Sequence, residues 1–346
     1  MSLTLYRKYR PQTFAEVIGQ EHIKKTLENE IKNERISHAY LFYGPRGTGK
    51  TTMGRIFAKA INCQNRKNNQ FEPCDQCLSC QQVKGARNLD LIEIDGASSG
   101  GIDQIRELRE NIRFAPSGGK YKIFIIDECH QVSGPAFNAL LKTLEEPPAH
   151  AVFILVTTEL HKVPPTIASR CQKFSFAKVA VKEILNKLER IIKNEGVKVE
   201  PEVLKNIARL SQGYVRDAES LLAQILSLGD KDITLEEASL IIPYQEFEKV
   251  NKLIELLMNK NSQAAIQVIN EIVEEGVDLK QFNLNIIEAL RNMLLNKIKG
   301  EKDNQEIQIS ETIKMIEEFL KIKNYLDSNE IPQLPLELAV VKICHL

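Results

Sequence analysis

The sequence predicts an α/β domain with a parallel sheet in its first half, followed by a long helical region. Over residues 1–176, five short apolar runs alternate with patterns of helical spacing. The apolarity of each run is continuous rather than alternating, which is typical of strands that helices cover on both faces. The predicted strands are residues 38–43, 89–94, 121–126, 152–156 and 172–176.

The pattern becomes helical from about residue 177. Amphipathic spacing between glycines predicts three helices and a short fourth one, at residues 181–194, Pro201–Leu210, 216–228 and 233–240. The remaining residues contain few glycines and prolines, and their spacing predicts about five further helices. We therefore expect an α/β domain, a small helical domain and an all-helical domain, at residues 1–176, 177–242 and 243–346.

The overall charge of the chain is balanced. Its 346 residues include 46 Lys and Arg and 46 Asp and Glu, so the formal net charge is zero. Any contact with nucleic acid must then come from a local surface or from several chains together. No apolar run is long enough to span a membrane, and the N-terminus lacks the apolar core of a signal peptide. A cytoplasmic location and no membrane partner are expected.

Residues 44–51 form a phosphate-binding motif. They fit G-x-x-x-x-G-K-[ST] in full and lie between a predicted strand and the predicted helix Lys50–Ile61. Glycines let backbone N–H groups face phosphate oxygens, and the helix adds the positive end of its dipole. Lys50 is expected to reach the β- and γ-phosphates of ATP, and the Thr51 hydroxyl to ligate Mg²⁺. The expected ATP-binding residues of this loop are Gly44, Pro45, Arg46, Gly47, Thr48, Gly49, Lys50, Thr51 and Thr52.

Two acids, Asp127 and Glu128, follow the predicted strand 121–126. Carboxylates at the end of a buried strand are costly unless they face a cation or a solvated cleft. Asp127 is expected to bind Mg²⁺ through water, and Glu128 to orient and polarise the attacking water. Asp-Glu-Cys-His is also the tetrad of one helicase superfamily. Such a helicase needs a second α/β motor domain, whereas residues 177–346 look helical.

Four of the seven cysteines cluster at Cys63, Cys74, Cys77 and Cys80. In a cytosolic chain this clustering favours a metal. Four thiolates satisfy tetrahedral Zn²⁺ with no open position, which predicts a structural site in a module at about residues 62–82. The C-x2-C-x2-C spacing also begins a ferredoxin-type iron–sulfur run, but no Cys-Pro continues it. Zinc is favoured, with an iron–sulfur cluster and the absence of a metal as alternatives.

Several motifs resemble those of the clamp-loader AAA+ ATPases. The chain opens with Tyr-Arg-Lys-Tyr-Arg-Pro at residues 6–11 and Val-Ile-Gly-Gln at residues 17–20. Residues 137–148 read Phe-Asn-Ala-Leu-Leu-Lys-Thr-Leu-Glu-Glu-Pro-Pro, and Ser169-Arg170-Cys171 is similar to the inter-subunit motif of this group. The cysteine module after the first helix resembles that of the tau/gamma subunits of bacterial DNA polymerase III. The resemblance is strong over residues 1–242 and rests on helical character and position beyond them.

The resemblance implies a P-loop AAA+ domain with an inserted zinc module, a helical lid domain and an all-α collar domain. Within the AAA+ domain it implies that Val17 and Ile18 line the adenine pocket. It also implies that Arg170 is an arginine finger that reaches the ATP of a neighbouring subunit. A guanidinium suits that role because it is always charged and grips phosphate with a fixed fork.

Two sensor residues follow from the same resemblance. One is a threonine at the end of the predicted strand 152–156, where Thr158 is favoured over Thr157 as the residue that reads the γ-phosphate. In this family that strand lies between the strands that bear the phosphate loop and the acids. The other is Arg216, on the lid, in the motif Gly-Tyr-Val-Arg-Asp at residues 213–217.

A DNA-facing segment is expected at residues 95–101. Its small residues precede a predicted helix at 102–113, where free N–H groups can meet an anion. Since the family threads duplex DNA through a spiral of subunits, Ser99, Gly100 and Arg106 are expected to face the DNA backbone without base specificity. A solvated turn is the alternative interpretation.

The function that the resemblance implies is that of the ATPase motor subunit of the replicative clamp loader. It would use ATP to open the sliding clamp and load it on primed DNA. The implied partners are the clamp, the DNA and a pentamer of self-copies with delta- and delta-prime-like subunits. The alternatives are a free-standing AAA+ or DExH-type remodeller or helicase, and a non-hydrolysing structural subunit, which would lack the loop lysine. Whether the chain ends at Leu346 or continues into a polymerase- and helicase-binding tail is left open.

Overall fold

The protein is described by a computed structural model, in two compact parts. The described residues are 4–67, 69–99, 108, 110–229, 232–239, 241, 244–298, 309–323, 325–326 and 331–345. The chain divides into an N-terminal unit, Met1–Ala238, and a C-terminal unit, Ser239–Leu346. Each unit has its own core.

The N-terminal unit contains a five-stranded parallel sheet in the order β2-β3-β4-β1-β5. The strands are β1 Ala39–Tyr43, β2 Leu91–Asp95, β3 Lys122–Asp127, β4 Ala151–Thr157 and β5 Gln172–Ser175. All five predicted strands are therefore confirmed, and β4 lies between β1 and β3 as the family pattern requires. β1, β3 and β4 are almost entirely buried, which explains their continuous apolarity.

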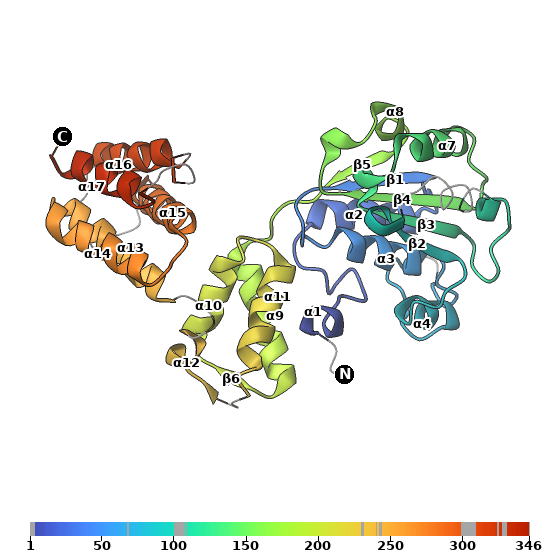
Figure 1. The fold of residues 1–346 in the computed structure, drawn as a ribbon. Helices are drawn as coiled ribbons and strands as arrows, with labels where there is room; N and C mark the ends of the chain where they lie inside the picture. The colour runs from blue at the N-terminus through green and yellow to red at the C-terminus, as the bar shows by residue number, and fades with distance from the viewer. Residues whose placement is uncertain are drawn as a thin grey trace. The chain divides into compact units, whose positions relative to one another are not determined.

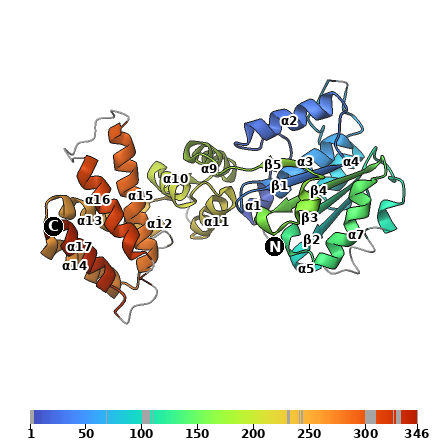
Figure 2. The same ribbon diagram turned by 90° about the horizontal axis from the view of Figure 1, so that it is seen from above.

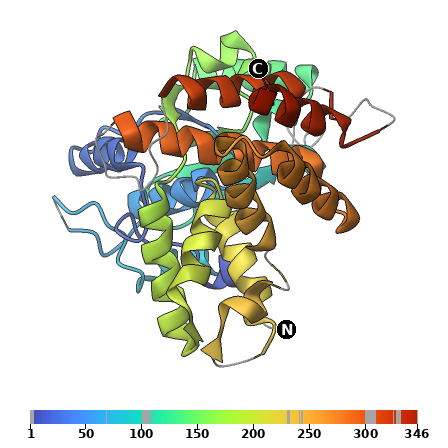
Figure 3. The same cartoon turned by 90° about the vertical axis from the view of Figure 1, so that its left-hand side faces the viewer.

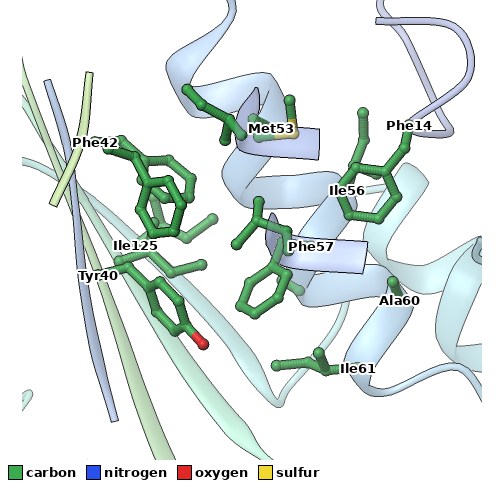
Figure 4. Close-up of a cluster of buried hydrophobic side chains, with 14 of the residues drawn as sticks. Phe14, Tyr40, Phe42, Met53, Ile56, Phe57, Ala60, Ile61 and Ile125 are labelled. Atoms are coloured by element: carbon green, nitrogen blue, oxygen red, sulfur yellow. The ribbon is translucent and has the colours of Figure 1, made fainter. Parts of the chain in front are cut away.

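Helices cover both faces of this sheet (Figures 1 and 2). One face carries Tyr40 and Phe42 and packs against α2 (Glu21–Lys32) and α3 (Lys50–Ile61). Figure 4 shows this core, in which Phe57 of α3 meets Tyr40 edge-on at 4.9 Å between ring centroids. The other face carries Ala39 and Leu41 and packs against α7 (Gly134–Glu145) and α8 (Pro165–Ala168).

Shorter elements complete this half of the unit. They are α1 (Leu5–Lys8), α4 (Leu78–Lys84), α5 (Gly96–Ser99) and two 3₁₀ turns, η1 (Cys129–Gln131) and η2 (Leu160–Lys162). The predicted helix at 102–113 falls largely outside the described residues.

The predicted small helical domain follows β5. Its helices are α9 (Val181–Glu195), α10 (Pro201–Leu210), α11 (Val215–Leu226) and α12 (Leu235–Ser239). The short fourth helix starts later than predicted, because Asp232–Ile233 forms the strand β7, which pairs in parallel with β6 (Lys198–Val199). Two-residue strands are too short to leave a periodic signal in the sequence.

The C-terminal unit is helical throughout its described residues (Figure 3, orange to red). It contains α13 (Tyr244–Met258), α14 (Ser262–Glu274), α15 (Leu279–Ile298), α16 (Ile309–Ile322) and α17 (Leu334–His345). Their core includes Leu253, Ile269, Phe282, Phe319 and Val340. The prediction of about five helices is confirmed over these residues, while the domain boundaries at 176/177 and 242/243 stay predictions. None of the described helices is long and apolar enough to cross a membrane.

Candidate nucleotide site and cysteine cluster

The phosphate loop runs from the end of β1 to the start of α3. Gly44 has a φ of +141°, and a Cβ there would lie 2.3 Å from the Phe176 carbonyl oxygen, so only glycine fits. Gly49 has a φ of +94° and is the N-cap of α3, a helix whose first N–H groups have no partner within the helix. This backbone can present a row of donors to an anion.

Lys50 bends back over the same loop. Its Nζ donates to the carbonyl oxygens of Gly44 at 2.9 Å and Pro45 at 2.8 Å. Burial lowers the pKa of Lys50, and the negative charges of Glu128 and Asp127 oppose that shift. Because the Lys50 ammonium is already largely removed from water, little further desolvation of this group is needed when it pairs with a polyanionic ligand.

The two acids lie at the carboxyl end of β3, beside the loop. Asp127 Oδ2 accepts a 2.7 Å hydrogen bond from the Thr51 hydroxyl, and Asp127 Oδ1 accepts one from the Glu128 N–H at 3.0 Å. Glu128 itself has a φ of +44°, in the left-handed region that costs a non-glycine residue about 1 kcal/mol or more. Such strain is characteristic of functional positions. The structure thus brings together the residues predicted to bind the phosphates (Lys50), to hold Mg²⁺ (Thr51 and Asp127) and to orient the attacking water (Glu128).

The two candidate sensor threonines have different surroundings. The Thr158 hydroxyl donates to Glu128 Oε2 at 3.1 Å. Thr157 is fully buried, and its hydroxyl contacts His130 Nδ1 at 3.0 Å and accepts the Glu159 N–H. Only Thr158 touches a predicted catalytic group, which agrees with the preference for it in the sequence. His130, whose Nδ1 lies 3.5 Å from Glu128 Oε2, was not predicted as a site residue.

One pocket joins these groups to residues from the N-terminal segment and the small helical domain. It contains the predicted residues Val17, Ile18 and Arg216 along with the loop from Arg46 to Thr52 and the two acids. It also contains six residues to which the sequence analysis gave no role, namely Tyr6, Arg10, Pro11, Lys187, Val215 and Glu219. Tyr6, Arg10 and Pro11 belong to the opening motif, which could have signalled them.

Arg216 and a buried ion pair form the helical side of this pocket. The Arg216 guanidinium lies 4.7 Å from the centre of the Tyr6 ring, a cation–π contact. Its neighbours Lys187 of α9 and Glu219 of α11 pair at 2.6 Å, and burial raises the pKa of Glu219. In the sequence these two residues look like ordinary polar positions on the solvent-exposed faces of amphipathic helices, so their pairing could not be predicted. Arg216 thus brings a positive charge from the small helical domain into the same pocket as the phosphate loop.

Arg170 lies away from its own chain's pocket. Its guanidinium donates to Glu145 Oε1 at 2.6 Å and to the Thr166 carbonyl oxygen at 2.6 Å. The side chain is one-third exposed. Of the residues expected to face DNA, Gly100 and Arg106 lie outside the described residues, as does the side chain of Ser99.

The four clustered cysteines converge on one point. Their sulfurs all lie within 4.8 Å of one another, with 3.9 Å between Cys74 Sγ and Cys80 Sγ. Sulfurs at about 2.3 Å from a tetrahedral Zn²⁺ are about 3.8 Å apart, so the donor set fits zinc. Burial opposes ionisation of Cys74, but N–H groups of Gln76 and Cys77 lower its pKa to about 6. Backbone N–H groups also point at the sulfurs of Cys63 and Cys77, as expected around thiolates.

Strand order, phosphate loop, acids and helical cover together define an AAA+ P-loop fold. A solved structure of the Thermotoga maritima RuvB Holliday junction branch migration motor has the same fold. It has a TM-score of 0.52 and 20% identity over 72% of this chain and 80% of that one. The family models for the DNA polymerase III delta subunit, the clamp loader subunit ATPase lid domain and domain III of subunits gamma and tau match residues 19–180, 183–231 and 233–324.

Comparison with whole proteins specifies the family further. The gamma subunit of DNA polymerase III from Buchnera aphidicola (subsp. Baizongia pistaciae) is 35% identical, over 93% of this chain and 87% of its own length. The tau subunit of Bacillus subtilis is 41% identical over 98% of this chain but 63% of its own length. The tau subunit of Escherichia coli is 39% identical over 84% of this chain and 45% of its own length. The chain belongs to the family of DNA polymerase III tau and gamma clamp-loader subunits, and it spans less than two thirds of these tau subunits.

Proposed function

We propose that this protein is the ATPase motor subunit of a bacterial replicative clamp loader, which opens a sliding clamp and loads it on primed DNA. The observation that carries the proposal is the convergence of Lys50, Thr51, Asp127 and Glu128 in one pocket of a chain from this family. ATP is the substrate of that pocket. Its phosphates bind the backbone N–H groups of residues 44–52 and the Lys50 ammonium, and Val17 and Ile18 contact the adenine.

The chemistry divides among four side chains. Thr51 and Asp127 hold Mg²⁺, which when bound neutralises charge on the β- and γ-phosphates. Glu128 accepts a hydrogen bond from the attacking water and aligns it with the γ-phosphorus. Thr158 keeps the Glu128 carboxylate in place through its 3.1 Å hydrogen bond and senses the γ-phosphate.

Two arginines complete the site from other positions. Arg216 contacts the γ-phosphate from the lid of the same chain. Arg170 serves the ATP of the neighbouring subunit, which is consistent with its distance from the pocket residues of its own chain and with its partial exposure. An arginine supplied in this way can accelerate hydrolysis by about 10³- to 10⁵-fold.

The cysteine cluster is proposed to hold a structural Zn²⁺ through Cys63, Cys74, Cys77 and Cys80. The set is closed, with four sulfurs and no position left for a substrate, so the ion supplies folding stability rather than catalysis.

The C-terminal unit is proposed to be the collar that joins the subunits of a pentamer with self-copies and delta- and delta-prime-like subunits. Exposed apolar residues at helical spacing support this role, on α16 (Ile309, Ile313 and Leu320) and on α17 (Leu334, Leu338 and Val341). The collar helices of neighbouring subunits are the proposed occupants of this face. Contact of Ser99, Gly100 and Arg106 with DNA phosphates remains part of the same proposal.

The test is ATP hydrolysis by the purified chain assembled with its partner subunits, with and without sliding clamp and primed DNA. A clamp loader is stimulated when both are present. A free-standing remodeller or helicase would hydrolyse ATP alone and would ignore the clamp, and that result would overturn the proposal.

A further inference from the structure

The cysteine module contacts the segment that forms one wall of the nucleotide pocket. Residues 11–18 have no regular secondary structure, yet Pro11, Val17 and Ile18 all line the pocket. A segment without its own hydrogen-bond ladder depends on outside partners for its shape. Two of these partners are the carboxylate oxygens of Glu72, in the loop between Cys63 and Cys74. The others come from helices: Lys59 of α3 donates to the Gln12 side chain, and Lys24 of α2 donates to the Val17 carbonyl oxygen at 3.0 Å.

Glu72 is the first of these partners. Its Oε2 accepts the Phe14 N–H at 2.9 Å and its Oε1 accepts the Ala15 N–H at 2.8 Å. Both carboxylate oxygens are thus used on two successive backbone donors, and charge-assisted bonds of this kind are among the stronger ones in proteins. Glu72 lies two residues before Cys74, so the convergence of the four cysteines restricts where its carboxylate can lie.

Phe71 adds an apolar contact next to Glu72. Its ring lies 6.0 Å from that of Phe14, and the Lys32 ammonium lies 4.9 Å from its centre. Phe14 is almost fully buried against Ile56 of α3, as Figure 4 shows. Phe71 therefore gives the module a direct apolar contact with Phe14.

Lys59 makes a third link between the cysteine module and the segment 11–18. This α3 lysine is 2% exposed, and its ammonium contacts the Asp75 carboxylate and the Gln12 side-chain oxygen, the latter at 3.3 Å. Asp75 directly follows Cys74. A buried ammonium needs such partners, because an unpaired charge is costly inside a protein.

We infer that the metal-bound cysteine module positions the base side of the nucleotide pocket, with Glu72 as the positioning residue. This inference rests on the proposed nucleotide site. The Val17 N–H donates to the Phe14 carbonyl oxygen at 3.2 Å, so displacement of Phe14 is passed directly to a pocket residue. None of the described hydrogen bonds joins Glu72 to the phosphate loop. Displacement of Glu72 should therefore leave phosphate binding by the loop unchanged.

The decisive variant is Glu72→Ala, compared with Gln70→Ala in the same loop as control. Among the described residues, the hydrogen bonds of Gln70 go to Lys67 and Arg66, both within the module. Zinc content, thermal unfolding and equilibrium binding of ATP and of inorganic triphosphate are measured on each protein. Loss of the two hydrogen bonds is expected to weaken ATP binding by about tenfold. Zinc content and triphosphate binding should stay at wild-type values, as should every property of Gln70→Ala.

A folded, zinc-loaded Glu72→Ala protein that binds ATP as tightly as wild type would overturn the inference. Failure of the wild type itself to bind ATP would instead overturn the proposed function. Glu72→Gln, which keeps the side-chain volume, covers the case in which the alanine variant does not fold. Amide hydrogen exchange of wild type supplies a measurement without any substitution. Removal of zinc by a chelator should speed exchange at Phe14 and Ala15, and unchanged exchange there would contradict the link.

Discussion

The Thr51 hydroxyl and the Asp127 carboxylate lie in direct contact, 2.7 Å apart, although they begin a helix and end a strand from different parts of the chain. Parallel strands bring their carboxyl ends to one edge of the sheet, and β1 and β3 flank β4 there. The fold therefore forms the proposed Mg²⁺ site from residues that are distant in sequence.

Asp127→Asn should remove most of the effect of Mg²⁺ on ATP binding. Asparagine can still accept the Thr51 hydrogen bond, but it lacks the charge that attracts the cation. ATP titrations with Mg²⁺ are expected to show about tenfold weaker binding than wild type. Titrations without Mg²⁺ should show little difference, and an undiminished response to Mg²⁺ would remove Asp127 from the metal site.

Substitutions of the last residue of β4, Thr157, and of Thr158 directly after it should have separable effects. Thr158→Ala frees the Glu128 carboxylate, so ATP turnover in the assembled loader is expected to fall about 10- to 100-fold with ATP affinity unchanged. Thr157→Ala instead leaves buried partners unsatisfied and should lower the thermal unfolding temperature of the N-terminal unit. If Thr157→Ala impaired turnover more than Thr158→Ala in folded protein, the sensor assignment would have to be exchanged.

Metal content tests the cysteine cluster. Cys80→Ser is expected to abolish stoichiometric zinc and to lower the unfolding temperature by about 5 °C, because metal binding contributes to folding. Cys344→Ser, at a buried cysteine outside the cluster, should keep its zinc. Iron with its visible absorbance in the wild-type protein would favour the iron–sulfur alternative.

A charge on the proposed collar face should weaken assembly. Leu338 of α17 is 52% exposed, so Leu338→Glu can be accepted by the isolated fold. In the pentamer it would place an unpaired carboxylate in an apolar interface, with an expected loss of about tenfold or more in association. Sedimentation velocity with the partner subunits measures this. Gln267→Glu on α14 is the control, and equal assembly by both variants would exclude this face.

The sequence predicted the elements that have strong local signals. Continuous apolar runs located all five strands of the sheet, and the glycine-rich motif located the loop and the start of α3. The cysteine spacing likewise predicted a cluster that the fold brings together.

Contacts between distant segments could not be predicted in the same way. Lys187 and Glu219 look like polar positions on two amphipathic helices, and only the packing of α9 beside α11 places them in the pocket. The bond between Glu72 and the Phe14 N–H joins two irregular segments, where no periodicity exists to be read. Backbone strain at Glu128 also leaves no trace in residue type, because glutamate seldom adopts a positive φ.

Hydrolysis completed by a neighbouring subunit is tested most directly by mixing two inactive variants. Lys50→Ala cannot use its own site but still offers Arg170, whereas Arg170→Ala has an intact site and lacks the finger. Each variant alone, assembled with the partner subunits, should show ATP turnover reduced by about 10³-fold. Assemblies that contain both variants should show turnover well above that of either variant alone, since some Arg170→Ala sites then adjoin a Lys50→Ala subunit. Mixed assemblies as inactive as either variant alone, or full activity of Arg170→Ala by itself, would contradict the account.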